Sequence, residues 1–115
     1  MAALGGDLLK GNVLTLILTL LGEQPMYGLQ IAKEIARRSG GAFQFKEGLL
    51  YPSLHHLEKA GLVASEWHHS GHGPDRKYYT LTAAGRKEAA RRRKRWSAFA
   101  KAMEAGLGGE GGSGE

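Results

Sequence analysis

The stretch "EGLLYPSLHHLEKAGLV", residues 47–63, predicts a helix that stops sharply before a strand. Its proline does not break the helix, because Pro52 falls in the first turn, where few amides have helical partners. Gly61 then ends a helix that we place at about residues 48–60. The apolar side chains of this helix have the i, i+4, i+7 spacing that buries one side: Leu50, Leu54 and Leu57.

The residues after this helix predict a β-hairpin with a basic tip. Residues 62–67 are assigned to one strand and residues 77–81 to its partner. A hairpin tip does not need cations, so the pair Arg76 and Lys77 requires a functional explanation. The connection between the strands is made of turn formers: Gly71, Gly73, Pro74 and Asp75.

Two helices are expected before residues 47–63 and one after the hairpin. The first lies at about residues 7–21 and the second at about residues 27–39, and each is followed by glycine. The last helix begins at the N-cap Thr82 and reaches about Ala105. Its apolar side chains fall near a heptad seam: Ala89, Trp96, Phe99, Met103 and Leu107.

Three helices followed by a hairpin is the element order of a winged helix-turn-helix. In that architecture the third helix enters the major groove of DNA and the hairpin, or wing, lies along the phosphates. The predicted fold class is therefore mainly α with a small β-hairpin wing, plus a C-terminal dimerisation helix. We expect residues 7–81 to form the winged-helix domain and residues 82–105 the dimerisation helix. The glycine-rich ends, residues 1–6 and 106–115, are expected to be disordered.

Composition is compatible with this assignment. A chain of 115 residues with 42% hydrophobic residues forms one domain with a modest core, which self-association would help. The formal net charge of +5 favours a polyanionic partner, although a solubilising charge excess explains it equally well. The absence of cysteine excludes disulfides and thiolate zinc sites and fits the cytoplasm. The apolar run at residues 13–21 is far shorter than the roughly 20 residues of a membrane span, so we expect a buried helix and no membrane partner.

Three segments make the chain resemble the PadR-type transcriptional regulators, a family of bacterial winged-helix repressors. They are "YGLQIAKEI" at residues 27–35, "EGLLYPSLHHLEKAGLV" at residues 47–63 and "GPDRKYYTLTAAG" at residues 73–85. They occur in the family's order and spacing, and the resemblance covers roughly residues 8–105. The single last helix is similar to that of the family's short members.

The resemblance implies a homodimer whose last helices pack with the partner's first helix. It also implies an inverted-repeat operator on double-stranded DNA and release by an effector, such as a phenolic acid or a flat aromatic drug. We therefore expect a cytoplasmic bacterial protein that is nucleoid-associated when bound. Three positions depart from the family pattern and leave the operator sequence open: Leu49 in place of a small hydroxylated residue, His56 in place of arginine, and Asp75 in place of a basic residue.

The side chains left outward by the buried leucines are the candidate DNA contacts. On this helix they are Tyr51, Pro52, Ser53 and His56. Ser53 and His56 can donate or accept hydrogen bonds at base edges, while Tyr51 can reach a phosphate or stack on a sugar. Two alternatives stay open: Tyr51 packs only against the wing, and His56 is simply solvated. The candidate phosphate contacts are Arg76, Lys77, Lys10 and Lys46.

Two further clusters of charged or titratable residues allow more than one interpretation. The basic run at residues 86–95 is either a second phosphate-binding patch or a solvated face beside the dimer seam. His68, His69 and His72 suggest a metal site, but adjacent strand residues diverge and no carboxylate or thiol ligand is clustered with them. We expect neither a metal ion nor another cofactor.

The apolar face of the last helix is the candidate dimer and effector interface. Trp96, Phe99 and Met103 share this face, and we group Leu14 of the first helix with them. Two-fold symmetry can bring the two Trp96 rings together, where they could sandwich a flat aromatic or cationic compound. Such a stripe is more often plain dimer core, so both interpretations stay open.

No catalytic constellation is visible, so we do not expect an enzyme. Serines lack a paired histidine within a glycine-rich elbow, and no phosphate-binding glycine loop follows a strand. The leading hypothesis is a dimeric, effector-responsive, sequence-specific transcriptional repressor. The alternatives are a multidrug-binding sensor, a non-specific DNA-binding protein and a winged-helix protein-interaction module.

Overall fold

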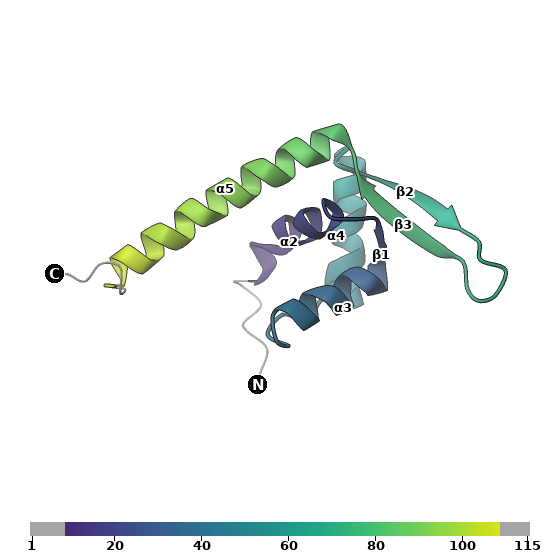
Figure 1. The fold of residues 1–115 in the computed structure, drawn as a ribbon, viewed down its shortest axis with the longest axis horizontal. Coiled ribbons are helices and arrows are strands. Elements are labelled where there is room, and N and C mark those ends of the chain that lie inside the picture. The colour runs from purple at the N-terminus through teal and green to yellow at the C-terminus, as the bar shows by residue number, and fades with distance from the viewer. Residues whose placement is uncertain (1–8, 109–115) are drawn as a thin grey trace.

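The computed structural model describes residues 9–108 and confirms the predicted fold class (Figure 1). The helices that lie wholly within these residues are α2 (Val13–Leu21), α3 (Gly28–Arg38), α4 (Glu47–Lys59) and α5 (Ala83–Gly106). The strands are β1 (Met26–Tyr27), β2 (Val63–His68) and β3 (Arg76–Leu81). Residues 106–108 of the predicted tail end α5 and form a turn, while the disorder predicted for residues 1–6 and 109–115 lies outside the described residues.

The hydrophobic core is organised around α2. This helix contacts α3, α4, α5 and β3, and its sequence is apolar on nearly every side, as expected of a buried helix. The most deeply buried side chains come from three helices, which explains how so short a chain closes a core. They are Val13, Ile17, Leu18, Leu20, Ile31, Leu54 and Leu57.

The first predicted helix is interrupted. Leu9 and Lys10 are helical, Gly11 and Asn12 form a turn, and α2 begins only at Val13. Glycine destabilises a helix interior by about 1 kcal/mol relative to alanine, which favours a break at Gly11. The prediction of one continuous helix over residues 7–21 is therefore wrong for its N-terminal part.

The sheet contains one strand more than the predicted hairpin. β3 is central and pairs antiparallel with β2 on one side and with the two-residue β1 on the other. Tyr27, which we expected inside a helix, is extended at the N-cap of α3 and lies opposite Tyr78 of β3. A strand of two residues has no detectable periodicity, so the sequence pattern could not predict it.

The C-terminal end of α4, the base of the wing and the start of α5 meet at one place, which we call the junction (Figure 1). The Thr82 hydroxyl donates to the Gly61 carbonyl at 2.7 Å and accepts from the Gly85 amide at 3.0 Å, which confirms the predicted N-cap. The Thr82 amide donates to the Leu62 carbonyl at 3.1 Å. Gly85 packs so closely on Leu62, the residue before β2, that a Cβ atom there would clash with the Leu62 carbonyl oxygen.

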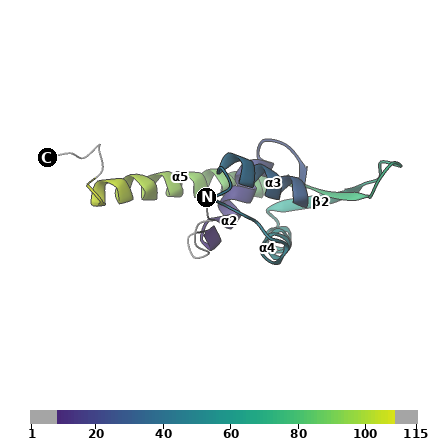
Figure 2. The ribbon, with the colours of Figure 1, turned by 90° about the horizontal axis from the view of Figure 1, so that it is seen from below.

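The second half of α5 extends beyond the rest of the domain (Figures 1 and 2). Gly85 and Ala89 of its first half are buried against the domain. The apolar side chains of the second half are exposed instead: Trp96, Phe99, Met103 and Leu107.

We expect Gly85→Ala to destabilise the protein by on the order of 2 kcal/mol, although alanine is the better helix former. The added methyl group cannot coexist with the Leu62 carbonyl oxygen, so the start of α5 must move away from the wing. Thermal unfolding followed by circular dichroism measures this, and a shift of about 4–8 °C per kcal/mol is typical of a domain this size.

Gly48→Ala is the matched control, because a Cβ atom there meets nothing within 4 Å and the residue lies in a helix. Its melting temperature should stay the same or rise. A Gly85→Ala protein that melts no lower than Gly48→Ala would contradict the steric explanation.

Candidate nucleic-acid interface

The exposed side of α4 lies opposite three buried leucines. Its buried side is formed by the predicted leucines, Leu50, Leu54 and Leu57. At 100° per residue, the positions directly opposite these leucines have the spacing i, i+4, i+7, i+11. They are Gly48, Pro52, His55 and Lys59, all exposed, with Tyr51 and His56 exposed on the flanks.

Sequence reasoning missed His55 and Lys59. Both side chains lie nearer the middle of the exposed side of α4 than His56, one of the residues predicted to contact bases. The helical spacing from Pro52 could have identified them.

Ser53 is less available than we expected. It is half-buried, and its hydroxyl donates to the Leu49 carbonyl at 2.7 Å. A hydroxyl used in this way bonds the preceding helical turn rather than a base edge. A contact between Ser53 and DNA stays a prediction.

Tyr51 packs within the domain and is also accessible from outside. A Cβ atom at Gly28 would lie 2.7 Å from Tyr51 Cε1, so the ring lies directly on the start of α3. The residue is still 44% exposed. The start of α3 is therefore one internal packing partner of Tyr51, and the exposed part of Tyr51 remains available to a phosphate or sugar.

Both wing cations are oriented by neighbours. The Arg76 guanidinium lies 4.6 Å from the centre of the Tyr27 ring, a cation–π contact that joins the wing to the start of α3. Lys77 Nζ lies 3.8 Å from Glu58 Oε1 and 5.7 Å from the centre of the Tyr79 ring. Burial raises the pKa of Tyr79, so its phenol stays neutral beneath the lysine.

Glu58 connects the exposed helix to the wing. Besides its contact with Lys77, its carboxylate accepts a 2.6 Å hydrogen bond from the Ser65 hydroxyl of β2. One carboxylate of α4 therefore contacts both long strands. This arrangement fixes the exposed side of α4 relative to the wing, as a surface that docks on a rigid duplex requires.

The other two lysines predicted to contact phosphates occupy different places. Lys46 is exposed at the N-cap of α4. Lys10 is exposed just before the turn at Gly11, which α2 follows.

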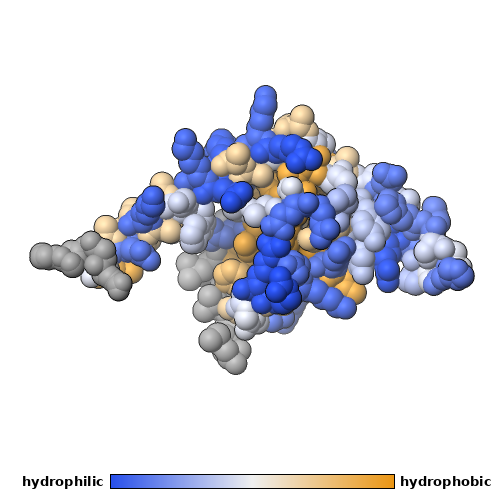
Figure 3. All heavy atoms as spheres, viewed as in Figure 1, coloured by the Kyte–Doolittle hydropathy of each residue, from blue (hydrophilic) through white to orange (hydrophobic). Residues whose placement is uncertain are grey.

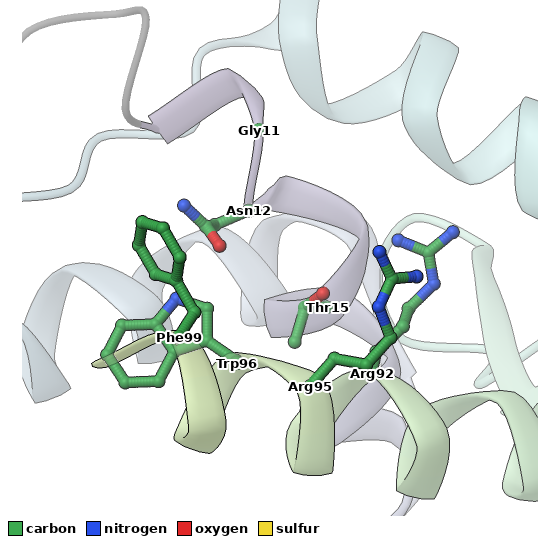
Figure 4. A pocket seen from close by; sticks show the side chains of 7 residues that line it. All are labelled: Gly11, Asn12, Thr15, Arg92, Arg95, Trp96 and Phe99. Carbon is green, nitrogen blue, oxygen red and sulfur yellow. The ribbon is translucent and has the colours of Figure 1, made fainter. Parts of the chain in front are cut away.

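A hollow of about 320 Å³ lies between α2 and α5, on the side of the predicted effector residues (Figure 4). The rings of Trp96 and Phe99 lie beside Asn12, and the guanidinium groups of Arg92 and Arg95 lie at the other end. A second hollow of about 430 Å³ is also lined by Trp96, together with Leu16, Phe43 and Arg93 among others. Met103 is exposed further along α5, and Leu14 is half-buried against the core and lines neither hollow.

Half of the lysines and arginines of the chain lie on α5, and the net positive charge is concentrated there. Eight lysines and arginines against two glutamates give this helix a formal charge of +6, compared with +5 for the whole chain. Glu88 bonds Arg91 and Arg92, whose guanidinium groups lower the pKa of its carboxyl to about 2. Figure 3 shows hydrophilic residues along α5 and also over the wing.

Residues 9–108 contain no group of three or more metal-ligating side chains that could hold an ion. None of the helices in this part of the chain is long and apolar enough to span a bilayer.

Several solved structures and one curated protein are similar to this chain. A transcriptional regulator from Clostridium thermocellum is 30% identical, with 89% of this chain and 96% of that chain covered and a TM-score of 0.80. A PadR family transcriptional regulator from Eggerthella lenta is also 30% identical, with coverages of 88% and 86% and a TM-score of 0.76. An uncharacterised protein from Lysinibacillus sphaericus is 33% identical over 91 residues, 79% of this chain and 84% of that protein.

The sequence pattern of the family described as "Transcriptional regulator PadR-like family" matches residues 17–91. This range contains α3, α4, the wing and the first turns of α5, all the elements that form the surface described above. The fold, the surface and the sequence pattern agree: the chain belongs to the PadR-like family of DNA-binding transcriptional regulators.

Proposed function

We propose that the protein is a cytoplasmic homodimeric repressor that binds an inverted-repeat operator and is released by a small aromatic effector. The observation that carries this proposal is the single surface formed by α4 and the wing, which Glu58 connects through Ser65 and Lys77. On this surface α4 enters the major groove and contacts bases, and the wing contacts phosphates. The protein acts by binding and performs no catalysis.

The homodimer is supported by the apolar side of α5. Trp96, Phe99, Met103 and Leu107 are between 45% and 77% exposed, on a helix that extends away from its own domain. A contiguous apolar patch of this kind marks an interaction site. Because a two-fold axis repeats the same surface on each protomer, two copies of α4 are presented to two half-sites, and an inverted repeat matches that symmetry.

The proposed effector site is the hollow between α2 and α5. Trp96 and Phe99 supply flat apolar surfaces, while Arg92 and Arg95 supply positive charge. These side chains favour a planar aromatic compound with a carboxylate over a planar cation. An occupant would alter the packing of α5 on α2 and thereby the spacing of the two recognition helices.

We expect Arg76→Ala together with Lys77→Ala to weaken binding to all duplexes alike and to reduce the salt dependence of affinity. Removal of one phosphate contact from each protomer lowers the slope of log K against log salt concentration by about 0.9 per protomer. Fluorescence anisotropy at several salt concentrations, with the upstream DNA of the protein's own gene and a random duplex, gives both quantities.

Lys33→Ala is the control for the wing variant, because it removes an exposed cation from α3. Its salt slope should match that of the parent. Equal slopes for the double variant and the parent would rule out phosphate contacts by these two side chains.

We expect His55→Ala to reduce discrimination between operator and random DNA by about 1–3 kcal/mol, the usual contribution of a good base contact. Its imidazole lies in the middle of the exposed side of α4. Ser53→Ala is the matched comparison and should change discrimination little, because the Ser53 hydroxyl is bonded to Leu49. The reverse ranking of the two variants would place the base contacts on the Ser53 flank.

We expect Trp96→Ala to lose most of the affinity for a planar aromatic anion such as anilinonaphthalene sulfonate, because it removes one wall of the hollow. Dye fluorescence measures binding, and sedimentation shows whether the variant remains dimeric. Lys101→Ala, an exposed residue of the same helix that lines neither hollow beside Trp96, should bind the dye as the parent does. Unchanged dye affinity in dimeric Trp96→Ala would place any effector elsewhere.

A further inference from the structure

The wing contains a small polar hollow of its own, which we call the wing cradle. It has a volume of about 290 Å³ and lies where β2 and β3 run into the connecting loop. Its lining includes one permanent cation, two imidazoles and two hydroxyls. The lining residues are His68, His69, Ser70, Pro74, Arg76 and Tyr78.

Each cationic or titratable side chain of the wing cradle is held in place by a separate neighbour. The His68 ring stacks on Tyr78, with ring centres 4.3 Å apart and planes 25° apart. His69 Nδ1 lies 2.9 Å from Asp75 Oδ2, across the loop. The Arg76 guanidinium is oriented by its contact with the Tyr27 ring. Three independent contacts therefore pre-position donors around one space, which lowers the entropic cost of binding an anion.

The charges that face these side chains depend on pH. Glu66 Oε2 lies 4.0 Å from His68 Nε2, and Asp75 contacts His69, so two carboxylates oppose Arg76 while both imidazoles are neutral. Histidine side chains generally change charge between about pH 5 and pH 8. Protonation of both would reverse the local balance from negative to positive. The other titratable or charged groups of these strands and their loop are His72, Lys77, Tyr78 and Tyr79.

We propose that the wing cradle holds one backbone phosphate of DNA and that binding is coupled to protonation of His68 and His69. This inference rests on the proposed DNA-binding function and adds a proton dependence to it. Each imidazole takes its proton from the solvent, and the phosphodiester, already an anion, accepts hydrogen bonds from the imidazolium and guanidinium groups. The bound state then carries more protons than the free state, so affinity for DNA rises as pH falls.

The distribution of histidines makes the test specific. The chain has five histidines, two on α4 and three on the wing and its loop. His72 is an exposed imidazole of the loop that does not line the wing cradle, so it is the control for His68 and His69.

The experiment measures the affinity of the full chain for a random-sequence duplex between about pH 6 and pH 8 at constant salt. A random duplex is suitable because a phosphate contact does not depend on base sequence. We expect the parent to bind on the order of tenfold more tightly at the lower pH. Calorimetry in buffers of different ionisation enthalpy should show proton uptake on binding.

The decisive comparison is His68→Gln with His69→Gln against His72→Gln. The double variant should lose most of the pH dependence and of the proton uptake, whereas His72→Gln should retain them. Arg76→Gln should weaken binding at every pH. Melting temperatures confirm that each variant is folded.

Two results would overturn the proposal: a parent whose affinity does not change with pH, or a pH dependence that the variant lacking His68 and His69 retains. A parent that binds no DNA at any pH would contradict the proposed function itself, which is a different failure.

Discussion

The junction is the contact on which the other parts of the structure depend. There the Thr82 hydroxyl joins the Gly61 carbonyl to the first turn of α5, and Gly85 lies directly on Leu62. The last turn of α4, the base of the wing and the start of α5 are thereby fixed to one another within a few residues. The proposed base-reading helix, phosphate-binding hairpin and dimerisation helix all start or end there, so their relative orientation is set locally.

Much of this arrangement could be predicted from the sequence, because it depends on local patterns. The leucine spacing of α4, the glycines that end the helices and the N-cap Thr82 each act over a few residues. The element order and family motifs then sufficed for the fold class. The two-residue strand β1 escaped prediction because it exists only through pairing with β3, about fifty residues further along the chain.

The details of the candidate site were less predictable. Helical spacing shows which side of α4 is outward but not what each side chain bonds. The Ser53 hydroxyl bonds its own helix, and Lys77 lies against Glu58, a residue on another element. The wing cradle likewise depends on the register that places His68 opposite Arg76, which no sequence pattern near either residue reveals. The excess positive charge of α5, by contrast, is visible in the sequence as the basic run at residues 86–95.

The first half of α5 is buried by its own domain, whereas the second half needs a partner to bury it. Association of two subunits is therefore linked to folding. The first half completes the core through Ala89 and Gly85, whereas the second half leaves Trp96 and Phe99 without cover. If the proposed dimer forms, part of the stability of each domain is supplied by its partner, and the folded fraction rises with protein concentration by mass action. At low abundance the separate subunits would be less stable and more exposed to proteolysis. The cellular amount of such a regulator would then influence its own lifetime as well as the occupancy of its operator.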